Sequence, residues 1–162
     1  MIINDIIDKD TMKREKLLEE PFVQKSITKY LASKGWNSNL ATRGLNEHGV
    51  DIKVKNDKVS RYWLIETKGD PSIKVKSPYG SRISTFHSAL GQIITRMHTS
   101  GKRGYKYKYK YGIGFPMSFK EMILKKLPYD VCDKLNLYVF FVNERGNVEE
   151  FSHKEIKQIQ KG

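Results

Sequence analysis

The stretch GVDIKVKNDKVSRYWLIETK, residues 49–68, decides the fold. From Asp51 to Lys55 it alternates charged with apolar side chains, as a half-buried strand does. Polar residues 55–58 then form a turn, and the continuous apolar run from Tyr62 to Ile65 indicates a strand covered on both faces. The stretch therefore predicts a β-hairpin whose second strand is central in a sheet and continues to Lys68.

Segments on both sides of this hairpin predict helices that cover the sheet. Apolar residues recur at helical spacing after Pro21, which predicts a helix over 22–34. A broad apolar stripe that follows a capping Ser84 or Thr85 predicts a second helix over 85–98. Residues 37–48 are expected to form a loop with a short strand, and residues 72–84 a long basic loop.

The second half of the chain predicts further strands and helices. Tyrosines and lysines alternate over 105–111, which we interpret as a half-buried strand running on to 115, although such a pattern also suits stacking on bases. Helices are expected over 11–19, over 119–127 and from Ser152, and strands over 137–142 and 148–151. This order predicts an α/β fold with a mixed central sheet and helices on both faces, as one domain over 1–162.

Composition narrows the class of partner. Lys and Arg number 30 against 18 Asp and Glu, a net charge of +12 that favours polyanions such as nucleic acid. No apolar run reaches the roughly 20 residues of a membrane span, and the acidic start MIINDIIDKD does not resemble an export signal. Cys132 is the only cysteine, so we expect a reducing, cytoplasmic environment and no membrane partner.

The hairpin also predicts a catalytic site. It brings Asp51, at the start of the first strand, beside Glu66, at the end of the second. Two adjacent carboxylates repel unless a cation lies between them, and Mg²⁺ (or Mn²⁺ in its place) prefers such oxygen ligands. The Thr67 carbonyl is a candidate third ligand. Lys68 points to the same face as Glu66 and is placed to act on the attacking water or the phosphate.

Gly49-Val50-Asp51 followed by Glu66-Thr67-Lys68 resembles the PD-(D/E)xK nuclease superfamily, which includes restriction endonucleases and Holliday junction resolvases. The resemblance covers Glu20 to Met97 and implies a restriction-endonuclease-like core with the order αβββαβ. It implies Asp51 and Glu66 as metal ligands, Lys68 as the catalytic lysine, and catalytic roles for Gln92 and Glu20. Valine precedes Asp51 where the family's nominal motif has proline.

The candidate DNA contacts follow the catalytic strand. Lys74, Lys76 and Arg82 lie in the expected basic loop, and Arg96 follows Gln92 by one helical turn. A solvated loop explains each of Lys74, Lys76 and Arg82 equally well, and the dipole of a helix explains an acid at Glu20 as well as catalysis does.

The sequence therefore predicts a metal-dependent DNA endonuclease. A nucleic-acid-binding module of the same fold without effective catalysis is the alternative, and a basic scaffold protein is a third class. A homodimer would supply the two sites needed to cut two strands symmetrically, but no interface is readable.

Overall fold

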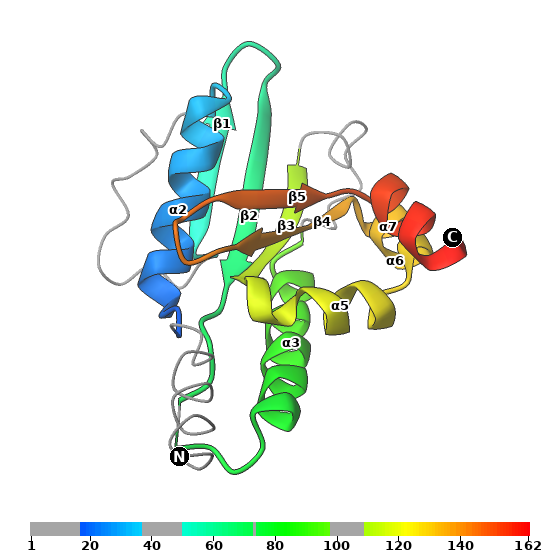
Figure 1. Ribbon diagram of the computed structural model, residues 1–162. Helices are drawn as coiled ribbons and strands as arrows, with labels where there is room; N and C mark the ends of the chain where they lie inside the picture. Colours follow the sequence, from blue (N-terminus) through cyan, green and yellow to red (C-terminus); the bar gives the residue numbers. More distant parts are fainter. Residues whose placement is uncertain (1–16, 37–49, 73, 98–108) are drawn as a thin grey trace.

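The computed structural model describes residues 17–36, 50–72, 74–97 and 109–162. Within them, five strands form one mixed sheet in the order β1-β2-β3-β4-β5 (Figure 1). The outer pairs, β1 with β2 and β4 with β5, are antiparallel, whereas the central pairs β2 with β3 and β3 with β4 are parallel. The strands are β1 (Ile52–Asn56), β2 (Arg61–Thr67), β3 (Tyr109–Pro116), β4 (Leu137–Val142) and β5 (Val148–Phe151).

Helices cover both faces of this sheet. They are α2 (Glu20–Ser33), α3 (Pro78–Thr95), the 3₁₀ turn η1 (Met117–Phe119), α5 (Lys120–Lys126), α6 (Tyr129–Leu135) and α7 (His153–Lys161). The mixed sheet with flanking helices confirms the expected α/β class. None of the helices described is long and apolar enough to cross a membrane.

Two hydrophobic clusters form the core, one between each face of the sheet and the helices that cover it. On one face, α3, α5, α6 and α7 pack over a cluster that includes Ile113 and Phe115 of β3. On the other face, α2 packs through Ile27 over a cluster that includes Trp63. The α2 face of β3 carries Gly114, where a Cβ atom would collide with the Ile27 side chain. The absence of that atom lets α2 lie close to the centre of the sheet.

The start of α3 corrects the sequence prediction. The helix begins at Pro78 and not at residue 85, and its N-cap is Ser77, whose hydroxyl accepts a hydrogen bond from the Gly80 amide at 3.2 Å. Arg82 therefore lies in α3 and not in a loop. The error arose because the first helical turns are half-exposed and carry little of the apolar stripe, whereas Ser77 and Pro78 carried the start signal.

A second difference is α6, which the sequence prediction missed. Pro128 is the N-cap of this seven-residue helix, and Asn136, its C-cap, has the left-handed conformation at φ 52°. Its short length gives too little periodicity to recognise. The hairpin, β4, β5 and the helix after Ser152 are confirmed, and Ser152 with Glu155 forms a capping box.

Other expectations fall wholly or largely outside the described residues. These are the helix over 11–19, the strand within 37–48 and the first part of the Tyr/Lys strand over 105–108. The implied αβββαβ order has three strands between two helices, and the described residues hold two, β1 and β2, between α2 and α3.

Candidate active site

The register of the hairpin brings Asp51 and Glu66 together. Ile52 pairs with Ile65 in the β1–β2 ladder, so the next position of the same antiparallel register sets Asp51 opposite Glu66. Opposed positions in such a ladder have Cβ atoms about 4.5–5.5 Å apart. Two carboxyl groups therefore meet where β2 ends, as the sequence predicted.

Neighbouring groups fix the orientation of Asp51. Its Oδ2 accepts hydrogen bonds from the Thr67 backbone amide at 2.7 Å and from the Thr67 hydroxyl at 3.1 Å. Its backbone carbonyl accepts a third bond, from Nε2 of Gln24 on α2, at 2.9 Å. Asp51 is thus attached to both the hairpin and the first helix, and no sequence pattern indicates the Gln24 contact.

Glu66 is the buried member of the pair. Its side chain is only 4% exposed, and its Oε1 atom is buried without a hydrogen-bond partner. Burial raises the pKa of Glu66 to about 7, assisted by the charge of Asp51 and by a hydrogen bond shared with that carboxyl. The charges of Arg96 and Lys68 act in the opposite direction and lower this pKa. The neighbouring basic residues therefore do not fully offset the cost of ionising Glu66 in this buried position.

These features fit a hard divalent cation. A buried carboxylate oxygen without a donor costs free energy, and an oxygen-preferring metal ion would satisfy it. Within residues 17–36, 50–72, 74–97 and 109–162, no group of three or more Asp, Glu, His or Cys side chains forms a metal site. A cation here would therefore rely on Asp51 and Glu66, with backbone carbonyl and solvent oxygens completing its coordination.

Lys68 and Glu20 lie next to this carboxyl pair. The Lys68 amide donates to the Gly114 carbonyl at 2.9 Å, which extends the β2–β3 pairing and leaves the half-buried lysine at the strand end. Glu20 lies in the first turn of α2. Burial raises the pKa of Glu20, as does the charge of Asp51, whereas Lys68 lowers it. The structure thus gathers five of the predicted residues: Asp51, Glu66, Thr67, Lys68 and Glu20.

Asp70, two residues after Lys68, has a structural role in the site. Its Oδ2 accepts a bond from the Leu18 amide at 2.8 Å, and its own amide donates to the Leu18 carbonyl at 2.8 Å. Its Oδ1 accepts a bond from the Ser118 hydroxyl at 2.5 Å. Asp70 therefore joins the end of β2 to the entry of α2 and to η1. Both partners are distant in sequence, so no local pattern indicates them.

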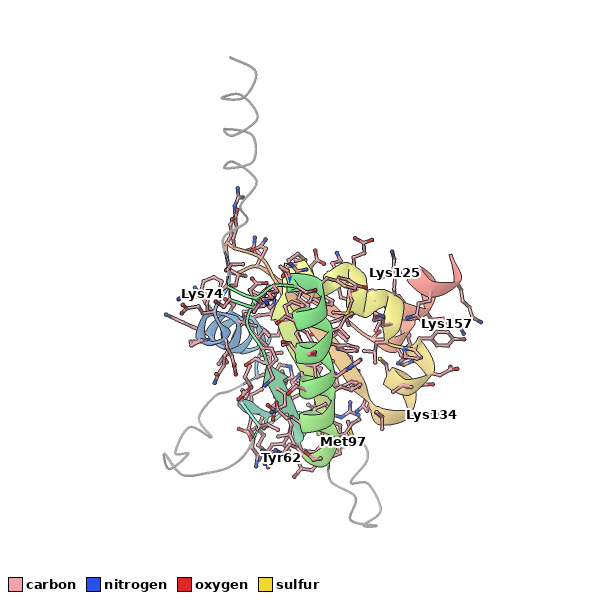
Figure 2. The ribbon with its side chains drawn as sticks, turned by 90° about the horizontal axis from the view of Figure 1, so that it is seen from below. Tyr62, Lys74, Met97, Lys125, Lys134 and Lys157 are labelled. Carbon is pink, nitrogen blue, oxygen red and sulfur yellow. The ribbon has the colours of Figure 1, made fainter. Side chains whose placement is uncertain are left out.

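The remaining predicted residues are more dispersed. Gln92 is exposed on α3. Its side-chain amide makes no hydrogen bond with the part of the chain described, so its catalytic role remains a prediction. Arg96, at the end of α3, is close enough for its charge to act on Glu66. Lys74 and Lys76 are exposed between β2 and α3. Figure 2 shows Lys74 beside α2, on the other side of α3 from Lys134 and Lys157.

Comparison with a solved structure supports the fold. No protein-family model matches the chain, and no curated protein matches it. A solved structure of an XisH family protein from Nostoc punctiforme superposes with a TM-score of 0.51 at 16% identity, covering 81% of this chain and 98% of that one. An fdxN element excision controlling factor from Anabaena variabilis gives a TM-score of 0.47 at 18% identity, over 80% of this chain and 96% of that one. The chain thus shares the XisH fold, a mixed-sheet architecture consistent with a restriction-endonuclease-like core.

Proposed function

We propose that this chain is a metal-dependent nuclease that hydrolyses phosphodiester bonds in DNA. The observation that carries the proposal is the carboxyl pair of half-buried Asp51 and buried Glu66 at the end of β2, with Lys68 beside it. A buried carboxyl with an unsatisfied oxygen and a pKa near 7 is costly to maintain for stability alone. Such groups occur preferentially where charge is needed for chemistry.

Each residue of the site has a distinct task in this proposal. Asp51, Glu66 and the Thr67 carbonyl would hold Mg²⁺ or Mn²⁺, which would supply charge compensation for the phosphate and activate water. Thr67 keeps the Asp51 carboxylate in place through its amide and hydroxyl. Lys68 orients or deprotonates the attacking water and stabilises negative charge that develops on the phosphate. The nearby charge of Arg96 helps Glu66 to ionise.

The choice of DNA as substrate rests on charge and position. The chain has a net charge of +12, and exposed Lys74 and Lys76 follow the catalytic strand directly. Lysines at this position would neutralise phosphates next to the scissile bond and hold the strand near Lys68.

A cleavage assay tests the proposal. Supercoiled, linear, single-stranded, flapped and four-way DNA would be incubated with the full chain and Mg²⁺ or Mn²⁺. We expect cleavage of at least one substrate, and we expect Lys68→Ala to abolish it while DNA affinity changes little, because Lys68 acts on the reacting groups. Lys58→Ala, which removes an exposed lysine from the hairpin turn, is the matched control and should cleave normally.

Two results would contradict the proposal. Lys68→Ala that cleaves at the rate of the wild type, with equal metal and salt, would exclude Lys68 from the chemistry. Salt-dependent DNA binding by the wild type without cleavage of any substrate would instead favour a binding module of the same fold.

A further inference from the structure

An open hollow of about 610 Å³ lies among the helices on one face of the sheet. Its walls come from α3, η1, α5 and α7, and three of its residues are apolar: Met117, Leu124 and Ile159. Ile159 is 49% exposed, so the hollow opens to solvent beside an apolar surface. This volume lies within the range of pockets that hold small organic groups.

Some of the basic residues that line the hollow have an acidic partner and one does not. Lys120 forms an ion pair with Glu149 at 2.7 Å, and Lys125 forms one with Glu121 at 3.0 Å. Arg82, by contrast, makes no ion pair with any residue that the structure describes, and its Nε atom is buried without a hydrogen-bond partner. The hollow therefore combines apolar walls with one guanidinium that forms no ion pair among the described residues and whose Nε atom has no hydrogen-bond partner.

A hydrogen bond connects this hollow to the catalytic strand. Ser118, which lines the hollow, donates to Asp70 at 2.5 Å. Asp70 follows Lys68 by two residues, a span of at most about 7 Å even in extended chain. A strand of nucleic acid cut at Lys68 would thus bring a neighbouring nucleotide close to the hollow.

We propose that the hollow binds an unpaired nucleotide of the substrate, next to the scissile phosphate. Arg82 contacts the phosphate, because a guanidinium matches phosphate oxygens in geometry and charge. Met117, Leu124 and Ile159 contact the base. A base stacked within a duplex presents only its edge, whereas an unpaired base can turn out and bury its apolar face. This inference rests on the proposed nuclease function and specifies its substrate as single-stranded or flapped DNA.

Binding measurements on the full chain test the proposal. Every protein carries Lys68→Ala so that DNA is not cut, and the probes are fluorescent oligodeoxythymidylate of about 12 nucleotides, within the usual range of single-strand sites, and a blunt duplex of equal length. We expect Arg82→Gln to weaken binding of the single strand about tenfold, as loss of a charge-assisted bond would. The duplex should change less than about twofold, because salt-dependent contacts outside the hollow supply its affinity.

A second variant keeps the test decisive if Arg82→Gln does not fold. Ile159→Glu places a carboxylate at the exposed rim of the hollow and should weaken single-strand binding in the same selective manner. Arg61→Gln and Val59→Glu make the same chemical changes at exposed positions of the β1–β2 hairpin and serve as matched controls. Arg61 begins β2, six residues or about 20 Å from Thr67 at its other end.

The outcomes separate this inference from the proposed catalysis. Selective loss of single-strand binding in both hollow variants supports the inference, even if the wild type cleaves no DNA. Equal losses for single strand and duplex, or no loss for either, would overturn it, even if the wild type proves to be an active nuclease.

Discussion

At the scale of single residues, Glu66 determines how stability depends on pH. Its pKa is raised from 4.5 to about 7 by burial, so the folded protein holds a proton that the unfolded chain releases. A raised carboxyl pKa means that the contribution of Glu66 to stability is fully present below pH 4.5 and is lost as pH rises through 7. The shift corresponds to a loss of about 3 kcal/mol at most, at 1.36 kcal/mol per pKa unit.

We therefore predict that the metal-free protein loses stability between pH 5 and pH 8 and that Glu66→Gln largely removes this loss. Glutamine keeps the shape of the side chain and cannot ionise. Urea unfolding of both proteins with chelator at several pH values measures the free energy of unfolding. An identical pH dependence in the two proteins would mean that Glu66 ionises normally.

Asp51 provides a prediction about metal. At pH 8, above the pKa of Glu66, the like charges of Asp51 and Glu66 repel without a cation between them. Asp51→Asn keeps an oxygen that can accept the Thr67 bonds and removes one charge. The variant should melt higher than the wild type in chelator, by about 2–4 °C for each kcal/mol of repulsion relieved. Added Mg²⁺ or Mn²⁺ should stabilise the wild type much more than the variant.

Asp57→Asn is the matched control for this experiment, because Asp57 lies in the exposed hairpin turn and pairs with Lys55. Its melting temperature should respond to metal as the wild type does. If metal raises the melting temperatures of wild type and Asp51→Asn equally, Asp51 is not a ligand.

The sequence could predict some of these residues because their relation is local. Asp51 and Glu66 are joined by one hairpin, so the strand pattern and the turn are sufficient to set them opposite each other. Gln24 and Asp70 could not be predicted in the same way. Their partners lie 27 and up to 52 residues away, and only tertiary packing brings them together.

At the scale of elements, Gly69 determines how closely α2 approaches the catalytic strand. A Cβ atom at this position would lie 2.5 Å from the Glu20 backbone nitrogen, at the start of the helix. Backbone atoms cannot move aside as a flexible side chain can. We therefore predict that Gly69→Ala displaces the start of α2, costs about 1–3 kcal/mol of stability and lowers cleavage, because Glu20 moves away from Lys68.

Gly91→Ala is the matched control, since a Cβ at this exposed position of α3 would meet no atom within 4 Å. Helix propensity predicts a gain of about 0.5–1 kcal/mol there. Denaturant unfolding of both variants measures the difference. Equal stability of Gly69→Ala and the wild type would show that α2 does not need this close approach.

The elements also show where sequence patterns succeed. Buried strands such as β4 are apolar runs bounded by turns, and they were placed correctly. The beginning of α3 differs from the prediction because its half-exposed first turns carry little of the apolar stripe, so the cap at Ser77 and the following Pro78 are the main signals that distinguish helix from loop.

At the scale of the whole molecule, local patterns gave the layers but not the order of the strands. β3 lies beside β2 and parallel to it, so the segment that contains α3 must connect the end of β2 to the start of β3 at the opposite edge of the sheet. No local sequence pattern specifies β2 as the neighbour of β3. The glycines of β3 contribute to this arrangement, because Gly112 and Gly114 leave room for Phe140 and Ile27. These constraints become visible only once the layers are assembled.

The distribution of charge over the molecule supports a final prediction. A net charge of +12 would attract DNA to any face, so the proposal requires that phosphate contacts concentrate near the catalytic strand. Each lysine that contacts a phosphate adds about 0.9 to the slope of log affinity against log salt. Lys74→Ala with Lys76→Ala should therefore flatten the slope by about one to two and weaken binding to all sequences alike.

Lys134→Ala with Lys157→Ala removes the same charge from the far side of α3 in Figure 2 and should leave the slope unchanged. Fluorescence titrations at several salt concentrations measure both slopes, and equal flattening by the two pairs would show that DNA is held by overall charge and not by this surface.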